Sequence, residues 1–132
     1  SYQSILANGD NNHFWLARPY ENLYRKLCSK ITGLSGYGLC SPNNISPGAW
    51  HHVALTFNQT TKRLELYLNG QSQIIDQGNS ASPSINPIYI GSFSTVTGDS
   101  IYNEWQGPID EVMIYNRALS AAEIKAAYDA TK

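Results

Sequence analysis

One long polar stretch, residues 94–107, gathers the side chains that are suited to recognising a sugar. Its candidate ligand-binding residues are Asp99, Tyr102, Asn103, Glu104 and Trp105. Aromatic faces stack on sugar rings, while carboxylates and amides form hydrogen bonds to hydroxyl groups, so the composition is typical of glycan recognition. Binding residues also concentrate in long, glycine-bearing loops. The alternative is that Trp105, like Trp50, is an aromatic residue of the core or of a strand edge.

Asp110 is the candidate metal ligand. By strand alternation it shares a face with Val112 and Ile114, and that face should point toward the core. A carboxylate there needs a partner, because an unpaired buried charge is costly. Calcium is one candidate, since hard cations collect carboxylates and carbonyls in loops beside strands. The alternative is that Asp110 accepts backbone N–H groups at the sheet edge. Three loop acids are either further cation ligands or solvated charges: Asp10, Asp99 and Glu104.

Catalytic patterns fail at specific positions. The stretch "GLSGY" does not match a nucleophile elbow, because Tyr37 stands where glycine is required. His51 and His52 are adjacent in a predicted strand, so they point to opposite faces and are not expected to share a metal. The side chains of Asp110 and Glu111 diverge, whereas a retaining glycosidase needs two carboxyl groups about 5 Å apart. We therefore expect no enzymatic activity.

The length, net charge and cysteine spacing of the chain limit the classes of protein to which it can belong. The 132 residues suffice for one domain with its own core. A net charge of −1 gives no reason to expect nucleic-acid binding, and no apolar run is long enough to span a bilayer. The spacing of Cys28 and Cys40 suits a local disulfide in an oxidising compartment, with two free buried thiols as the alternative. The expected location is secreted or on the cell surface.

The elements that would position these residues are mostly strands. Two alternating runs, residues 50–57 and 63–68, predict half-buried strands of one antiparallel sheet, and Asn69-Gly70 predicts a tight turn into a third. Ser120 and Glu123 have the spacing of a helix capping box. Further strands are expected in "QSILAN", "HFWLARPY", "NLYRKLCSKI", "YGLCS", "IYIGSF" and "PIDEVMIY". The predicted fold is an all-β, antiparallel β-sandwich of one domain, residues 1–132, with one short helix at about 121–130.

Three of these stretches carry a family resemblance. "GAWHHVALTFNQTTKRLELYLNG", "IYIGSF" and "GPIDEVMIYNRALSAAEIKAAY", roughly Gly48 to Tyr128, together resemble the laminin G-like, pentraxin-type domain. That domain is a concanavalin A-like jelly roll of secreted and cell-surface proteins. The resemblance implies this fold and a structural calcium near the last strand, completed by residues of early strands.

Members of that family usually begin several strands earlier. The resemblance therefore leaves three readings open: a shortened domain, a fragment of a longer polypeptide, or a domain whose missing strands come from a partner chain. An uncovered sheet edge would be prone to aggregation, so something is expected to cap it.

The leading functional hypothesis is a non-enzymatic extracellular module for binding or adhesion, which recognises a glycan or a protein partner. The second hypothesis is a structural module of a surface assembly, such as a pilus, fibre or surface layer, completed by strands from another segment or chain. The third is an accessory domain of a secreted glycosidase. Neither nucleic-acid binding nor membrane insertion is expected.

Overall fold

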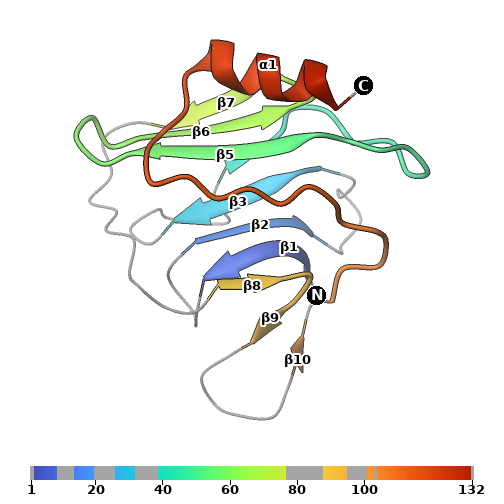
Figure 1. Cartoon of the computed structure of the whole chain (residues 1–132). Helices are drawn as coiled ribbons and strands as arrows, with labels where there is room; N and C mark the ends of the chain where they lie inside the picture. The colour runs from blue at the N-terminus through green and yellow to red at the C-terminus, as the bar shows by residue number, and fades with distance from the viewer. Residues whose placement is uncertain are drawn as a thin grey trace.

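The structure is a computed structural model, and it describes residues 2–8, 14–19, 26–31, 39–76, 88–94, 101–102 and 104–131. Its elements are ten strands and one helix within those ranges (Figure 1). The strands are β1 (Tyr2–Asn8), β2 (Phe14–Pro19), β3 (Cys28–Ile31), β4 (Leu39–Cys40), β5 (Val53–Asn58), β6 (Arg63–Leu68), β7 (Gln71–Asp76), β8 (Ile88–Ile90), β9 (Phe93–Ser94) and β10 (Ile101–Tyr102). The helix α1 spans Ala121–Ala130.

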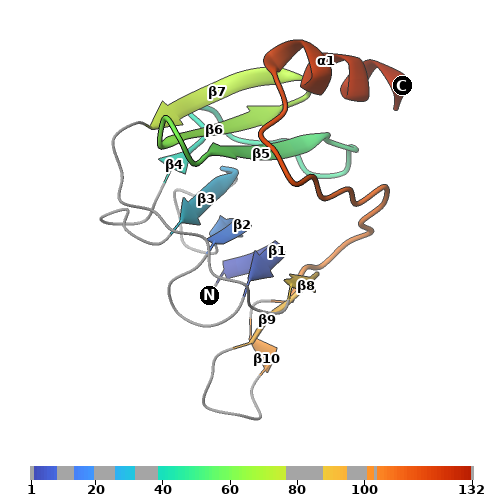
Figure 2. The same ribbon diagram turned by 60° about the vertical axis from the view of Figure 1, so that its left-hand side comes forward.

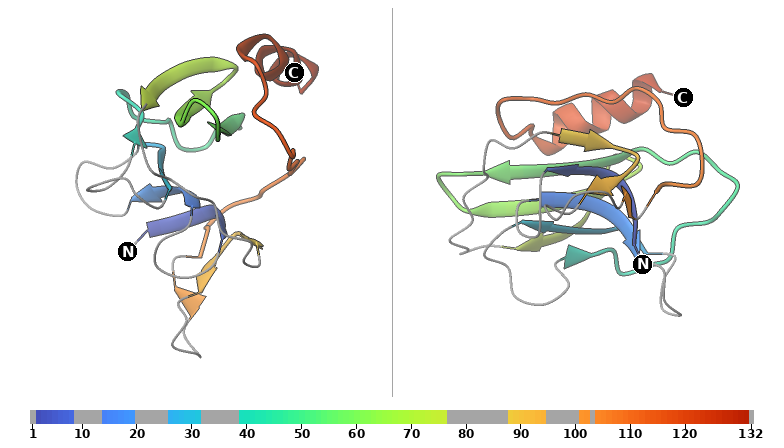
Figure 3. Two further views of the ribbon diagram at one scale, coloured as in Figure 1. Left: turned by 90° about the vertical axis from the view of Figure 1, so that its left-hand side faces the viewer. Right: turned by 90° about the horizontal axis from the view of Figure 1, so that it is seen from below.

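The described strands form three sheets with antiparallel pairing. The first has the order β4-β3-β2-β1-β8, the second the order β5-β6-β7, and the third joins β9 to β10. Viewed along the strands, the first two sheets approach each other where β4 lies near β7, and they diverge on the opposite side (Figure 3, left). We call that opposite side, which is bounded by β5 and β8, the open side. The predicted all-β antiparallel sandwich with one short helix is confirmed.

The central hairpin follows the predicted alternation. Leu55 of β5 pairs with Leu66 of β6, and Leu66 is fully buried. The connection is closed by the Asn58 side chain, whose Oδ1 accepts hydrogen bonds from the N–H groups of Thr60 and Thr61, both at 3.0 Å. Apolar side chains at every second position therefore place one face of this sheet against the interior.

The core lies between the two larger sheets. Leu27 and Leu66 are both fully buried and form its centre. Around them pack the partly buried Ile5, Ile45, Val53, Leu55, Leu68 and Ile74. A smaller cluster is centred on Leu64 and includes Leu39, Leu55 and Phe57. Much of the apolar lining is thus only half-buried, since every residue of β5 is partly exposed.

The turn at Asn69-Gly70 has the backbone that the sequence predicts. Asn69 has a φ of 51° and Gly70 a φ of 74°, which is the left-handed pair that a type I′ turn requires. The Asn69 N–H donates to the His52 carbonyl at 2.7 Å, and Asn69 Oδ1 accepts from the His52 N–H at 3.0 Å. The turn is thereby fastened to the residue that precedes β5.

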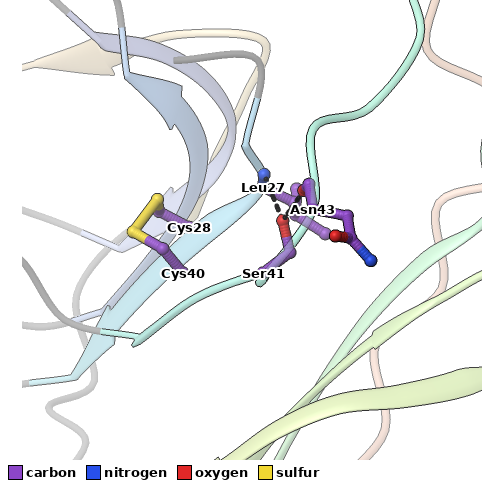
Figure 4. Close-up of a disulfide and its surroundings, with 5 residues drawn as sticks. All are labelled: Leu27, Cys28, Cys40, Ser41 and Asn43. Atoms are coloured by element: carbon purple, nitrogen blue, oxygen red, sulfur yellow. Dashed lines mark hydrogen bonds between the residues drawn. A yellow bond between two sulfur atoms is a disulfide. The ribbon is translucent and has the colours of Figure 1, made fainter. Parts of the chain in front are cut away.

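The disulfide joins neighbouring strands at the closed side of the sandwich. Cys28 of β3 is bonded to Cys40 of β4, as predicted, with an S–S distance of 2.01 Å (Figure 4). Beside it, the Ser41 hydroxyl accepts from the Leu27 N–H and donates to the Asn43 carbonyl. A cross-link that closes a loop of about fifteen residues stabilises a fold by about 3 kcal/mol, mainly by restricting the unfolded chain.

The helix begins with the predicted capping box. Ser120 Oγ accepts from the Glu123 N–H, and the Glu123 carboxylate accepts from the Ser120 N–H. Arg117 adds a bidentate ion pair to the same carboxylate, at 3.0 and 2.6 Å. These bonds hold the pKa of Glu123 down at about 2, with the Arg117 hydrogen bond as the largest cause. On its other side, α1 places Tyr128 against the turn at Gly70.

Two predicted strands differ from the structure. "IYIGSF" is two short strands, β8 and β9, separated at Gly91, which has a φ of 77°. "PIDEVMIY", residues 108–115, belongs to no strand. These eight residues lie in what we call the connecting segment, residues 104–120, which leads to α1 across the open side (Figure 1). The strand prediction fails here because no described strand pairs with this stretch.

Candidate recognition site around Trp105

The predicted site residues fall into two groups. Asp99 and Asn103 lie outside the described residues. Tyr102 ends β10 and pairs with Phe93 of β9, which places its backbone beside the residues that follow Gly91. Glu104 and Trp105 begin the connecting segment. Tyr102, Glu104 and Trp105 therefore follow one another beside β9 and Gly91, and we call Glu104 and Trp105 the corner.

Trp105 is held in place by its backbone and by a nearby glycine. Its N–H donates to the Gly91 carbonyl at 2.8 Å. A Cβ atom on Gly107 would lie 3.2 Å from the indole Nε1, so glycine lets the indole approach the chain closely. The indole is partly buried, and its Nε1–H has no hydrogen-bond acceptor among the described residues. The neighbouring Glu104 is exposed.

Trp50 is an exposed aromatic residue near the start of β5. The alternative of a core position does not hold for it, because 67% of its surface is exposed. It precedes the two histidines at the start of β5. Its position beside a strand with apolar alternation suggested burial, and no local pattern in the sequence signals its exposure.

Asp110 does not occupy the interior position expected from alternation. Its side chain is exposed, and Oδ1 accepts a hydrogen bond from the Glu111 N–H at 2.8 Å. Val112 and Ile114, predicted to face the core with it, are also exposed. The prediction of an inward face is wrong because the stretch is not part of a sheet. The alternative prediction holds in part: Asp110 accepts one backbone N–H, but from the adjacent Glu111 and not at a sheet edge.

The described residues do not assemble a calcium site at Asp110. Calcium requires six to eight oxygen ligands, several of them carboxylates. In the described ranges, no group of three or more His, Cys, Asp or Glu side chains is placed to hold a metal ion. The remaining acid candidates differ in status, since Asp10 and Asp99 lie outside those ranges and Glu104 is exposed.

The two histidines have separate surroundings. His51 Nε2 lies 2.8 Å from the Ser46 carbonyl oxygen. The His52 ring packs against Tyr128 of α1, with centroids 5.9 Å apart. Burial lowers the pKa of the His52 imidazole, and the carboxylate of Glu111 opposes this shift to a smaller extent. These contacts fix the start of β5 against the helix.

Glu65 is a buried carboxylate that the sequence analysis did not single out. It lies on β6 and is only 8% exposed. Arg63 donates two hydrogen bonds to Oε2, at 3.1 and 3.0 Å, and Ser72 of β7 donates to Oε1. Burial alone would raise the pKa of Glu65, but the hydrogen bonds from Ser72, Arg63 and Tyr67 hold it below its ordinary value. The carboxylate is satisfied within the sheet, so its role is to join β6 to β7.

Among the described residues, no helix is long and apolar enough to cross a bilayer.

Comparison with known proteins relates the whole chain to one group. The profile of the Laminin G 3 family, described as the concanavalin A-like lectin/glucanases superfamily, matches residues 1–125. This match confirms the resemblance seen in the sequence. A search of the curated proteins found no match.

Two solved structures share the fold. A native heptameric SAP-like pentraxin from Limulus polyphemus superposes with a TM-score of 0.75 at 17% identity, a level that shows the fold alone. An S-layer domain-containing protein from Clostridium thermocellum superposes with a TM-score of 0.53 at 27% identity. In both comparisons 97% of this chain is covered, and it spans 63% of the other chain.

Proposed function

Since the chain belongs to the concanavalin A-like lectin/glucanases superfamily, we propose that it is a non-enzymatic module that binds a glycan or a protein partner outside the cell. The observation that carries this proposal is the corner formed by Glu104 and Trp105. The disulfide between Cys28 and Cys40 supports an oxidising, extracellular location. The family description also includes glucanases, which supports an accessory role beside a secreted glycosidase as a variant of the same binding function.

The corner has the chemistry of a sugar subsite. An indole supplies an apolar face on which a sugar ring can stack. The Nε1 atom of Trp105 is shielded from solvent, so the indole would contribute stacking and not a hydrogen bond to a ligand. Glu104, which is exposed beside it, accepts hydrogen bonds from hydroxyl groups. Because the Trp105 backbone is fastened to Gly91, the indole is positioned before a ligand arrives. Such preorganisation reduces the entropic cost of binding.

A structural module of a surface assembly is the second candidate function. The S-layer domain-containing protein supports it, because that likeness extends over nearly the whole chain. The exposed apolar stretch of the connecting segment supports it as well. Calcium, which pentraxin and laminin G folds commonly bind, enters this proposal as a structural ion only if ligands outside the described residues join Asp110.

A glycan array with two tryptophan variants tests the recognition proposal. We expect wild-type protein to bind a subset of glycans and Trp105→Ala to lose at least tenfold in affinity, because the apolar face on which a sugar ring stacks is removed. Trp50→Ala is the matched control, because it removes an exposed indole elsewhere on the molecule. It should bind within about twofold of wild type.

Folding must be checked separately, because Trp105 is partly buried. Glu104→Gln is a second binding variant that should not disturb folding, since Glu104 is exposed and its replacement leaves the packing intact. Its melting midpoint should equal that of the wild type. Glu104→Gln is expected to weaken glycan binding without lowering the midpoint. Binding that is unchanged in both Trp105→Ala and Glu104→Gln would place the recognition site elsewhere and refute the assignment.

A further inference from the structure

The connecting segment contains four consecutive exposed apolar residues. The exposed fractions are 41% for Val112, 64% for Met113, 59% for Ile114 and 49% for Tyr115. Continuous apolar runs of this length are typical of strands that are covered on both faces. Isolated exposed apolar side chains are common on protein surfaces, but a contiguous group marks an interaction site.

Residues 112–115 have the local form of a strand without a partner, and they begin after Glu111, which has a left-handed φ of 50°. The Tyr115 hydroxyl donates to Met113 Sδ at 3.2 Å, so side chains two positions apart lie on the same side, as they do in a strand. No backbone–backbone hydrogen bond joins residues 108–115 to another residue in the described part of the chain. Within the described residues, the N–H and C=O groups of residues 112–115 therefore have no backbone partner.

Further exposed apolar residues lie on the open side that the connecting segment crosses. The segment crosses the open side, where the two larger sheets end in β5 and β8 (Figure 2). Ile88 and Ile90 of β8 are 41% and 53% exposed. The stretch that follows residue 109 runs in the same direction as β5 (Figure 1). A single strand entering here would be antiparallel to both, which is the pairing used throughout the described sheets.

We propose that residues 112–115 bind an extended β-strand from outside these 132 residues, with apolar side chains at alternate positions and a basic residue near one end. The basic residue would face Asp110 and Glu111. Residues 109–116 contain these two carboxylates and no basic side chain. The next basic residue, Arg117, is already bonded to Glu123, so a second copy of the same stretch would not provide this complementarity.

This inference rests on the second candidate function, the structural module, and gives that module its contact surface. Main-chain hydrogen bonds would supply affinity, and the alternating side chains would supply specificity, as in other strand-addition complexes. It is independent of glycan binding at Trp105, because the two sites use different residues. Failure of the glycan test therefore leaves it standing, and the reverse also holds.

A display experiment tests the proposal with defined probes. Two phage libraries of twelve-residue peptides would have the same composition: one has apolar residues at alternate positions with lysine or arginine near one end, and the other has them in a block. We expect at least tenfold stronger enrichment of the alternating library on the wild-type chain. Hydrogen–deuterium exchange should then show protection of residues 112–115 by a selected synthetic peptide.

Proline variants locate the pairing edge. Successive N–H groups of a strand point to opposite edges, so Met113→Pro and Ile114→Pro remove donors on different sides. We expect one of the two to weaken peptide binding at least tenfold more than Ile114→Thr, which keeps the N–H and the β-branched shape. Because the segment pairs with nothing in the described chain, all three should keep the wild-type circular dichroism spectrum and melting midpoint.

Several outcomes would overturn the proposal. One is equal enrichment of the two libraries, and another is peptide binding that neither proline changes. Protection of residues 112–115 without peptide, together with concentration-dependent dimers in sedimentation, would identify a second copy as the occupant. Protection by phosphatidylcholine vesicles would identify a lipid surface instead.

Discussion

His52 lies where the start of β5, the helix α1 and the connecting segment meet. Its ring packs against Tyr128, and its Nδ1 is buried without a hydrogen-bond partner among the described residues. Burial lowers the pKa of the imidazole, and the nearby Glu111 carboxylate opposes that shift only in part. The folded state thus favours the neutral form of His52.

The consequence is a loss of stability in mild acid. Above about pH 6.5, the imidazole is neutral in both states. As the pH falls below that value, the unfolded chain takes up the proton first, so the free energy of unfolding decreases until the lowered folded-state pKa is passed. We expect His52→Phe, which keeps an aromatic ring beside Tyr128, to lose less stability than wild type between pH 7.5 and 5.5. Urea unfolding at the two pH values measures this difference.

The other titratable groups should not affect the difference in pH dependence between the wild type and His52→Phe. His13 and His51 are present in both proteins, so their contributions cancel. Glu65 and Glu123 have lowered pKa values, so the stability they add is present above their ordinary values near 4.5 and is lost only at lower pH. An equal loss in the wild type and His52→Phe would show that His52 is not buried against the helix.

At the scale of elements, the helix α1 and the turn between β6 and β7 depend on Gly70. A Cβ atom at this position would lie 2.8 Å from Tyr128 Cδ1 and 3.2 Å from Lys125 Cδ. Gly48 has a similar left-handed backbone, with a φ of 77° against 74°, but nothing lies within 4 Å of its Cβ position. Comparing a substitution at Gly48 with one at Gly70 therefore separates the cost of backbone strain from the cost of contact with the helix.

Alanine at each glycine measures how firmly the helix is docked. We expect Gly48→Ala to cost about 1 kcal/mol of unfolding free energy, because only the left-handed backbone is strained. Gly70→Ala should cost about 2–3 kcal/mol, because Tyr128 must also move. Chemical denaturation of the two variants gives the difference. Equal costs would mean that α1 shifts away from the turn without penalty.

Elements whose signals are local could be predicted from the sequence. The alternation in β5 and β6, the Asn69-Gly70 turn and the Ser120–Glu123 capping box each depend on a few neighbouring residues. The strand expected at residues 108–115 could not be judged in this way. Its apolar residues have the right propensity, but a strand forms only when another strand supplies hydrogen bonds.

The candidate site was predictable in part for the same reason. The loop composition identified Glu104 and Trp105, yet only the structure shows that Gly91 and Gly107 position the indole. The predicted core-facing position of Asp110 was wrong, because it was derived from a strand that the structure does not contain at residues 108–115. Glu65 was missed because its partners Ser72 and Tyr67 meet it only in the folded sheet.

At the scale of the whole molecule, the question is whether a metal contributes to stability. The described residues provide one exposed carboxylate at Asp110, already bonded to the Glu111 N–H. We therefore expect the melting midpoint to be the same in millimolar calcium and in EDTA. A rise of several degrees in calcium, abolished by Asp110→Asn, would show instead that other parts of the chain complete a site with it.

The disulfide has a mechanical consequence for the sandwich. It fastens β3 to β4 where β4 lies near β7, on the side where the two sheets meet. The connecting segment crosses the opposite side with its apolar residues uncovered. The disulfide joins two strands of one sheet, so it keeps β4, the strand that lies near β7, attached to the rest of that sheet. Both cysteines of the chain are used there, so under oxidising conditions the edge beside β7 is covalently secured and the open side is not.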